Sequence, residues 1–114
     1  MNKRKTGAEY ENAAAAWLET KGYRILEHNY RTRLGEIDLI AEDGDYLCFI
    51  EVKYRSGTGF GMPAEAVDRR KQQKILAVSK YYLTVKGYWN RSIRYDIVEV
   101  LGNQIRVIRN CFGG

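Results

Sequence analysis

The chain has few of the residues that most often build zinc sites or histidine-based catalytic centres. Among its 114 residues there are two cysteines, Cys48 and Cys111, and one histidine, His28. The cysteines match no zinc-binding spacing, and a single histidine with no nucleophile motif beside it indicates a surface residue. We therefore expect no zinc site, a reducing compartment, and a Cys48 side chain buried in the core.

Long apolar runs are also missing. No stretch is long enough to span a membrane, and the basic start at residues 3–5 is followed by Glu9, Glu11 and Glu19 rather than by the apolar segment of a signal peptide. These absences predict a protein that does not associate with membranes and works in the cytoplasm.

Acidic and basic residues are unevenly distributed along the chain. The net charge is +5, but residues 1–57 carry 9 Lys and Arg against 10 Asp and Glu, whereas residues 58–114 carry 10 against 4. A basic second half beside an acidic, metal-binding first half fits a phosphodiester substrate such as a nucleic acid. The length and the hydrophobic content of 45% fit one globular domain spanning residues 1–114.

Hydrophobic periodicity and turn residues predict seven elements in the order αβββαββ. Helices are expected at 6–21 and 64–85, and strands at 23–30, 35–42, 45–54, 92–100 and 104–111. Flexible tails are expected at 1–5 and 112–114, and a flexible glycine-rich loop at 55–62. This succession predicts an α/β fold in which helices flank a mixed β-sheet, with the strand order left open.

A hairpin in the first half gathers charged side chains. The Asp43-Gly44 pair is a strong signal for a two-residue turn. Because residues two apart on a strand share a face, Glu36 and Asp38 lie on one side of their strand, and Glu51 and Lys53 on one side of theirs. A turn at this position would place Glu36 opposite Glu51 and Asp38 diagonal to it. Opposed like charges destabilise a sheet, so the cluster predicts a bound cation.

Magnesium suits this cluster, because Mg²⁺ prefers oxygen ligands and is often held by one or two carboxylates plus a substrate phosphate. Asp38 and Glu51 are the expected ligands. Such an ion acidifies a bound water and stabilises charge on a phosphoryl oxygen. Lys53 points into the same site, where it would orient the attacking water or neutralise the developing charge.

A solvated strand face is the alternative explanation for these charges. The flanking residues make both strands too apolar for a water-exposed edge, which favours a functional cluster: Leu39, Ile40, Phe49, Ile50 and Val52. Three alternatives stay open for Glu36. It binds a second ion, holds a metal-bound water, or faces outward and pairs with Arg31 or Arg33.

An acid on one strand followed by Glu-x-Lys on the next resembles the PD-(D/E)XK signature of restriction-endonuclease-like nucleases. More closely, the run from Gly35 to Arg55, with residues 63–67 and Lys71-Gln72 after it, resembles the YraN-like family of uncharacterised proteins, which is similar to archaeal Holliday-junction resolvases. The likeness covers about residues 6–108, and Ile37 stands where the signature has a proline. The resemblance implies a restriction-endonuclease-like core and a nuclease that uses Mg²⁺, with Mn²⁺ as a substitute.

The resemblance also implies roles for residues beyond these acids. Related resolvases place a glutamate of the first helix in the active site, which would be Glu9. However, Thr6-x-x-Glu9 is also a capping box, and one side chain cannot fully serve both purposes. Val52 is implied as a metal ligand through its backbone carbonyl. Related nucleases carry a polar helix residue near the scissile phosphate, which would be Gln72 or Lys71.

The second helix carries basic residues at its start. Lys71 falls on a stripe where an apolar residue is expected, alongside Val67, Ile75, Val78, Tyr82 and Val85. It must therefore extend its ammonium to solvent or face a polar cavity. A solvated first helical turn is the alternative for both Lys71 and Gln72. With Lys71, we expect Arg69, Arg70 and Lys74 to contact nucleic-acid phosphates, or else to be ordinary surface.

Together, these patterns predict a metal-dependent endonuclease acting on DNA, with branched DNA as the candidate substrate. One alternative is a nucleic-acid-binding module that kept the fold without cutting; another is an assembly factor in which the acids hold a stabilising ion. A homodimer would supply two sites for a symmetric junction. Asp96 is expected to pair with an arginine such as Arg94 or Arg106 rather than to bind metal.

Overall fold

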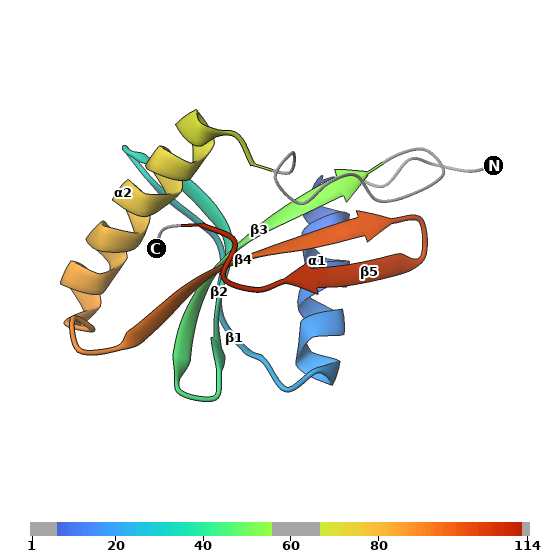
Figure 1. The fold of residues 1–114 in the computed structure, drawn as a ribbon, viewed down its shortest axis with the longest axis horizontal. Helices are drawn as coiled ribbons and strands as arrows, with labels where there is room; N and C mark the ends of the chain where they lie inside the picture. The colour runs from blue at the N-terminus through green and yellow to red at the C-terminus, as the bar shows by residue number, and fades with distance from the viewer. Residues whose placement is uncertain (1–6, 56–66, 113–114) are drawn as a thin grey trace.

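The computed structural model describes residues 7–55 and 67–112. In these residues the elements follow the predicted order αβββαββ (Figure 1). They are α1 (Gly7–Thr20), β1 (Arg24–Thr32), β2 (Gly35–Asp43), β3 (Tyr46–Arg55), α2 (Arg69–Lys86), β4 (Ser92–Leu101) and β5 (Gln104–Ile108). Within the described residues, neither helix combines the length and apolar character needed to cross a bilayer.

All the strands of the described chain form one mixed sheet, in the order β1-β2-β3-β4-β5. The first three strands make an antiparallel meander, β4 joins β3 in parallel, and β5 returns antiparallel to β4. The chain reaches β4 through α2, as a parallel connection requires a crossover. The α/β class and the mixed sheet are therefore confirmed.

Each face of the sheet is covered by one helix. Leu47 and Phe49 of β3 pack in a cluster that includes Val78 and Tyr82 of α2. The alternate residues of β3 pack with α1, and among them Cys48 is fully buried, as expected. The face that carries Leu47 and Phe49 also carries Glu51, so Glu51 lies on the α2 side of the sheet.

The turn between β2 and β3 differs from the expectation. Asp43 pairs with Tyr46, so the two-residue loop is Gly44-Asp45 rather than Asp43-Gly44. Every partner is consequently shifted by two residues, and Phe49 pairs with Ile40. The predicted pairing of Glu36 with Glu51 is wrong. The reason is local: Gly44, with a φ of 60°, is the first residue of the loop, a position where two-residue hairpin turns favour glycine. The Asp43 carboxylate, still within the strand, accepts a hydrogen bond from Arg94 Nη2 at 2.7 Å.

The second helix begins later than predicted, at Arg69 rather than residue 64. Asp68 is its N-cap, and its Oδ1 accepts a hydrogen bond from the Lys71 amide at 2.8 Å, which fixes the start of the helix. Val67 is buried, but it precedes the helix, and Val85 is exposed instead of lying on the buried stripe. Pro63 lies outside the described residues.

The structure describes one residue of the predicted flexible loop and one residue of the predicted C-terminal tail, and both are held in place. Arg55, the first residue of the predicted loop, ends β3 and its Nε donates to Glu99 Oε2 at 2.7 Å. The rest of that loop, residues 1–6 and residues 113–114 lie outside the described residues. Phe112 stacks on Tyr95, with 5.3 Å between the ring centroids.

Candidate functional site

Asp38 and Glu51 come together where β2 and β3 begin to separate. Their last paired neighbours are Leu39 and Ile50, so both acids lie one step beyond that pair. Asp38 Oδ2 accepts a hydrogen bond from the Val52 amide at 2.8 Å, which ties the β2 carboxylate to β3. Glu51 is only 3% exposed. Two acids from different strands thus share one partly enclosed space.

Burial and mutual repulsion make both carboxylates costly to ionise. Burial raises the pKa of Glu51, and the nearby charge of Asp38 raises it further. Burial likewise raises the pKa of Asp38, against the lowering effect of the Val52 amide and of Lys71. A cation placed between the two carboxylates would relieve both effects.

Lys71 supplies part of that positive charge. It stands in the first turn of α2, and its Nζ forms an ion pair with Glu51 Oε1. Burial alone would lower the pKa of Lys71, but the bond to Glu51 and the charge of Asp38 raise it overall. Lys71 therefore reaches a buried carboxylate while its side chain stays 51% exposed, and its contact with nucleic acid stays a prediction.

Glu36 does not face Glu51. It pairs with Arg31 across β1 and β2, and its Oε2 accepts a hydrogen bond from Arg31 Nε at 2.9 Å. Its side chain is 48% exposed. The outward pairing with Arg31, one of the three alternatives, is the arrangement found. Glu36 is nevertheless near enough to raise the pKa of Asp38, and a metal role for it stays a prediction.

The first helix brings Glu11 toward the acids, which was not expected from the sequence. Burial raises the pKa of Glu11, and the charges of Asp38 and Glu36 raise it further. Glu11 lies on the buried stripe of α1, at helical spacing from Ala14, Ala15 and Leu18. That spacing is visible in the sequence, but Glu11 was not among the residues predicted for the site. Glu9 is exposed on α1, and its role in the site stays a prediction.

Three other predicted site residues lie around this pair. Lys53 is half-buried and shares the strand face of Glu51. Val52 fixes Asp38 through its amide, while its role as a carbonyl ligand stays a prediction. Gln72 Nε2 donates to the Val67 carbonyl at 3.0 Å, so this side chain holds the segment that leads into α2. A catalytic role for Gln72 likewise stays a prediction.

The donor set fits a hard divalent cation. Asp38 and Glu51 offer carboxylate oxygens, and their combined charge exceeds that of Lys71, with Glu11 and Glu36 adding further negative charge nearby. No group of three acidic, histidine or cysteine side chains in the described part of the chain is close enough to form a complete metal cage. Mg²⁺ does not require one, because it keeps several waters and often binds through one or two carboxylates.

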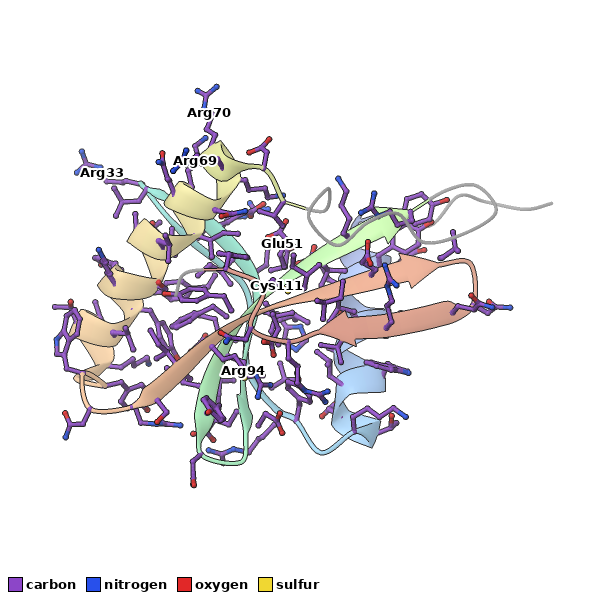
Figure 2. All side chains as sticks on the ribbon, viewed as in Figure 1. Arg33, Glu51, Arg69, Arg70, Arg94 and Cys111 are labelled. Carbon is purple, nitrogen blue, oxygen red and sulfur yellow. The ribbon has the colours of Figure 1, made fainter. Side chains whose placement is uncertain are left out.

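A basic surface adjoins the acids. Every arginine in the described residues forms an ion pair except Arg33, Arg69 and Arg70. Figure 2 shows these three side chains projecting outward around the N-terminal end of α2 and the β1–β2 turn. Arg70 and Lys74 border a hollow of about 490 Å³ between α2 and β2 that Lys71 and Glu36 also line. We call Arg33, Arg69, Arg70 and Lys74 the basic surface.

The sequence places this fold and site in a known family. The model of "Uncharacterised protein family UPF0102" matches residues 10–100. The chain belongs to the UPF0102 family. A UPF0102 protein of Fusobacterium nucleatum is 46% identical over 114 residues, covering 100% of this chain and 96% of its own. UPF0102 proteins of Moorella thermoacetica and Persephonella marina are 49% and 41% identical, covering 94% and 93% of this chain and 90% and 91% of their own.

The buried acids predict that this UPF0102 chain gains stability when one of them is neutralised. In EDTA near pH 8, Asp38→Asn should raise the free energy of unfolding by about 1 kcal/mol, or the melting temperature by roughly 4–8 °C, because the repulsion with Glu51 is removed. Differential scanning calorimetry measures this shift. Asp45→Asn, an exposed acid in the β2–β3 turn, is the matched control and should change nothing. A lower melting temperature for Asp38→Asn would contradict the repulsion.

Proposed function

We propose that this protein is a metal-dependent endonuclease that acts on DNA phosphodiesters, with branched DNA as its candidate substrate. The observation that carries the proposal is the meeting of Asp38 and Glu51 on one face of β2 and β3, beside a basic surface whose arginines have no ion-pair partners among the described residues. Two carboxylates that can bind a metal ion, next to arginines without ionic partners among the described residues, suit a polyanionic ligand such as DNA.

Asp38 and Glu51 would hold Mg²⁺, or Mn²⁺ as a substitute, and when bound the ion would acidify a water and stabilise charge on a phosphoryl oxygen. Lys53, on the strand face of Glu51, would orient the attacking water and neutralise charge that builds on the phosphate. Lys71, released from Glu51, would turn its ammonium toward the same phosphate. The basic surface would hold the flanking DNA backbone.

The direct test is cleavage of labelled DNA. Wild-type protein is incubated with a four-way junction, a flap, a plain duplex and a single strand, each with Mg²⁺, Mn²⁺ or EDTA. Cutting that needs metal and prefers one substrate would support the proposal. No cutting of any substrate, with either ion, would contradict it.

A second candidate function is supported by the ion pair between Lys71 and Glu51. Because a lysine already neutralises one of the acids, the site is held together without metal, which suits a nucleic-acid-binding module that does not cut. DNA binding in EDTA without cleavage in Mg²⁺ or Mn²⁺ would favour this module. Absence of both binding and cleavage would favour a protein-assembly role.

The basic surface predicts a strong dependence of DNA affinity on salt. Changing Arg69 and Arg70 to Ala should weaken binding to all DNA forms and reduce the slope of log K against log salt by about 0.9 for each phosphate that is no longer neutralised. Fluorescence anisotropy over a salt series gives the slope. Arg24→Ala, an exposed arginine paired with Glu42, is the control and should leave the slope unchanged. An unchanged slope in the double variant would exclude the surface as the phosphate-binding face.

A homodimer is proposed for symmetric junctions, since two strands cut at once need two sites and a two-fold axis supplies them. Light scattering with and without junction DNA tests this arrangement. A monomer under both conditions would rule it out.

A further inference from the structure

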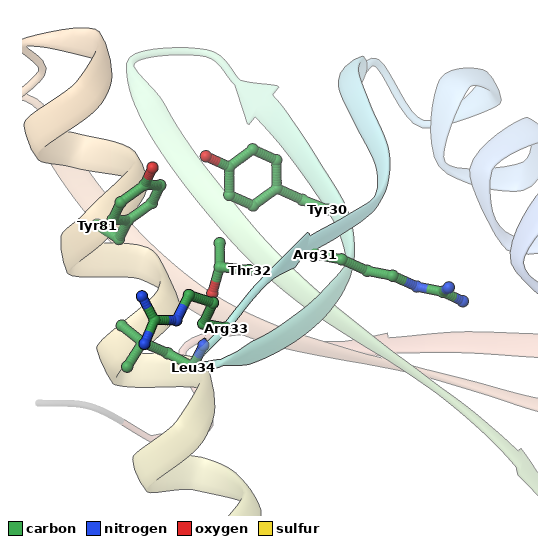
Figure 3. A pocket seen from close by; sticks show the side chains of 6 residues that line it. All are labelled: Tyr30, Arg31, Thr32, Arg33, Leu34 and Tyr81. Carbon is green, nitrogen blue, oxygen red and sulfur yellow. Dashed lines mark hydrogen bonds between the residues drawn. The ribbon is translucent and has the colours of Figure 1, made fainter.

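A second hollow lies farther along α2, at the turn between β1 and β2. It has a volume of about 590 Å³, within the range of roughly 300–1,000 Å³ common for ligand sites. Its lining residues are Tyr30, Arg31, Thr32, Arg33, Leu34 and Tyr81. Figure 3 shows that the Arg31 side chain points away from the hollow, while the two tyrosine rings, Leu34 and Arg33 surround it. We call this hollow the turn pocket.

The turn that forms one wall is short and held by local hydrogen bonds. Thr32 pairs with Gly35, which leaves only Arg33 and Leu34 in the loop. The Leu34 amide donates to Thr32 Oγ1 at 3.0 Å, which fixes the loop. Leu34 is nevertheless 51% exposed, so an apolar side chain is displayed at the tip of a tight hairpin. Apolar side chains, leucine among them, serve in some DNA-binding proteins as wedges between base steps.

Of the two tyrosine rings that line the turn pocket, one is packed against the core and the other is exposed to solvent. Tyr30 packs edge-on against Tyr82, with 5.0 Å between ring centroids, so its position is set by the core. Tyr81 is 48% exposed on α2 and offers its ring to the pocket. Arg33, beside the rings, forms no ion pair with a described residue. Aromatic rings next to unpaired positive charge are the components with which proteins bind unpaired bases and their phosphates.

The turn pocket and the first hollow both lie between the β1–β2 hairpin and α2. Gly35 lies against α2, where an added Cβ would come within 3.4 Å of Lys74 Cβ and 3.6 Å of Val78 Cγ2. Gly35 lines the first hollow, together with Glu36, Lys71 and Lys74. Lys71 and Tyr81 are ten residues apart, or about 15 Å along a helix. That spacing equals about four steps of a DNA duplex at 3.4 Å per step.

We propose that the turn pocket receives an unpaired nucleobase of the DNA, with the ring of Tyr81 stacking on the base, Leu34 wedged against the neighbouring pair and Arg33 on the adjoining phosphate. The inference rests on the proposed nuclease function and deepens it by naming the substrate class. The substrate is DNA in which an unpaired nucleotide lies about four steps from the bond that is cut.

The test compares matched oligonucleotides that differ by one feature. A plain duplex and the same duplex with a single unpaired nucleotide are bound in EDTA, and affinities are measured by fluorescence anisotropy. Tyr81→Ala and Leu34→Ala should each weaken binding to the unpaired substrate about ten-fold, as expected for loss of one stacked base, and leave the plain duplex unaffected. Tyr81→Phe keeps the ring and should bind like wild type.

Two controls separate this loss from general damage. Val85→Ala changes a residue of α2 that is 57% exposed and does not line the pocket, so it should have no effect on either substrate. Melting temperatures of all variants should match that of wild type, because Leu34 and Tyr81 are half-exposed. In Mg²⁺, cut positions mapped on the unpaired substrate should lie about four steps from the unpaired nucleotide.

The outcomes distinguish this inference from the proposed function. If wild type binds and cuts DNA, but Tyr81→Ala weakens plain and unpaired substrates equally or weakens neither, the turn pocket is not a base site and the nuclease proposal stands. If wild type binds no DNA of either form, both fail. Selective loss with the unpaired substrate, without any cutting by wild type, supports the pocket as the recognition site of a binding module.

Discussion

Asp38→Asn is expected to lower the rate of Mg²⁺-dependent DNA cleavage by more than about 100-fold without weakening DNA binding. The Asp38 carboxylate is held by the Val52 amide beside Glu51, so its oxygens are fixed where a cation would bind. Even groups that only orient a metal ligand typically contribute 10–100-fold to activity, and a ligand itself should contribute more. DNA affinity should be retained because the basic surface is untouched.

Single-turnover cleavage of the preferred substrate, with anisotropy for binding, measures the two effects separately. Asp45→Asn makes the same chemical change at an exposed turn position and should cut like wild type. Lys53→Ala should also reduce cleavage, and the double variant should be little worse than Asp38→Asn alone, because residues acting as a unit are not additive. Full activity in Asp38→Asn would show that the acids do not form the active site.

Asp96→Ala is expected to destabilise the fold by about 3–5 kcal/mol, a large part of the stability of a small domain. Asp96 is fully buried, and its carboxylate accepts hydrogen bonds from Arg94 Nε and Nη2 and from the Asn110 amide. The Tyr23 hydroxyl donates to the same carboxylate at 3.2 Å. Removing the Asp96 carboxylate leaves the buried Arg94 guanidinium with only Asp43 as an ionic partner among the described residues. The expectation that Asp96 pairs with Arg94 is confirmed, whereas Arg106 pairs with Glu99.

Urea unfolding followed by circular dichroism gives this free energy. Arg24→Ala removes an ion pair in which the arginine side chain is 75% exposed, and it should cost no more than about 1 kcal/mol. Adding Arg94→Met to Asp96→Ala should recover part of the loss, because the unpaired charge is then gone. A loss below about 1 kcal/mol for Asp96→Ala would mean that the network contributes little to stability.

The sequence predicted the meeting of Asp38 and Glu51 even though it predicted the wrong register. The Asp43-Gly44 signal placed the turn one residue early, because the overlapping pair Gly44-Asp45 is also a two-residue turn signal, and the structure places Gly44 first in the loop with a φ of 60°. This error shifted every partner by two residues. Because side chains alternate with a period of two, a shift of two keeps each residue on its face, whereas a shift of one would have separated the acids.

Other parts of the site depend on packing that local patterns do not determine. Glu11 was missed because an alanine-rich helix offers few bulky side chains to mark the buried face. Lys71 was recognised as anomalous, but its partner Glu51 is set by how α2 crosses the sheet. The strand order could not be predicted, because the parallel pairing of β3 with β4 joins segments far apart in the chain.

The parallel pairing of β3 with β4 has a consequence for how the chain folds. During synthesis β1, β2 and β3 emerge before β4 and can pair as local hairpins. Until residues 92–101 are made, the β3 edge that pairs with β4 stays open. That edge carries the apolar run at residues 47–50, a segment suited to aggregation. Glu51 and Lys53 end this run with charge, so the same side chains that form the candidate site also act as gatekeepers of the nascent sheet.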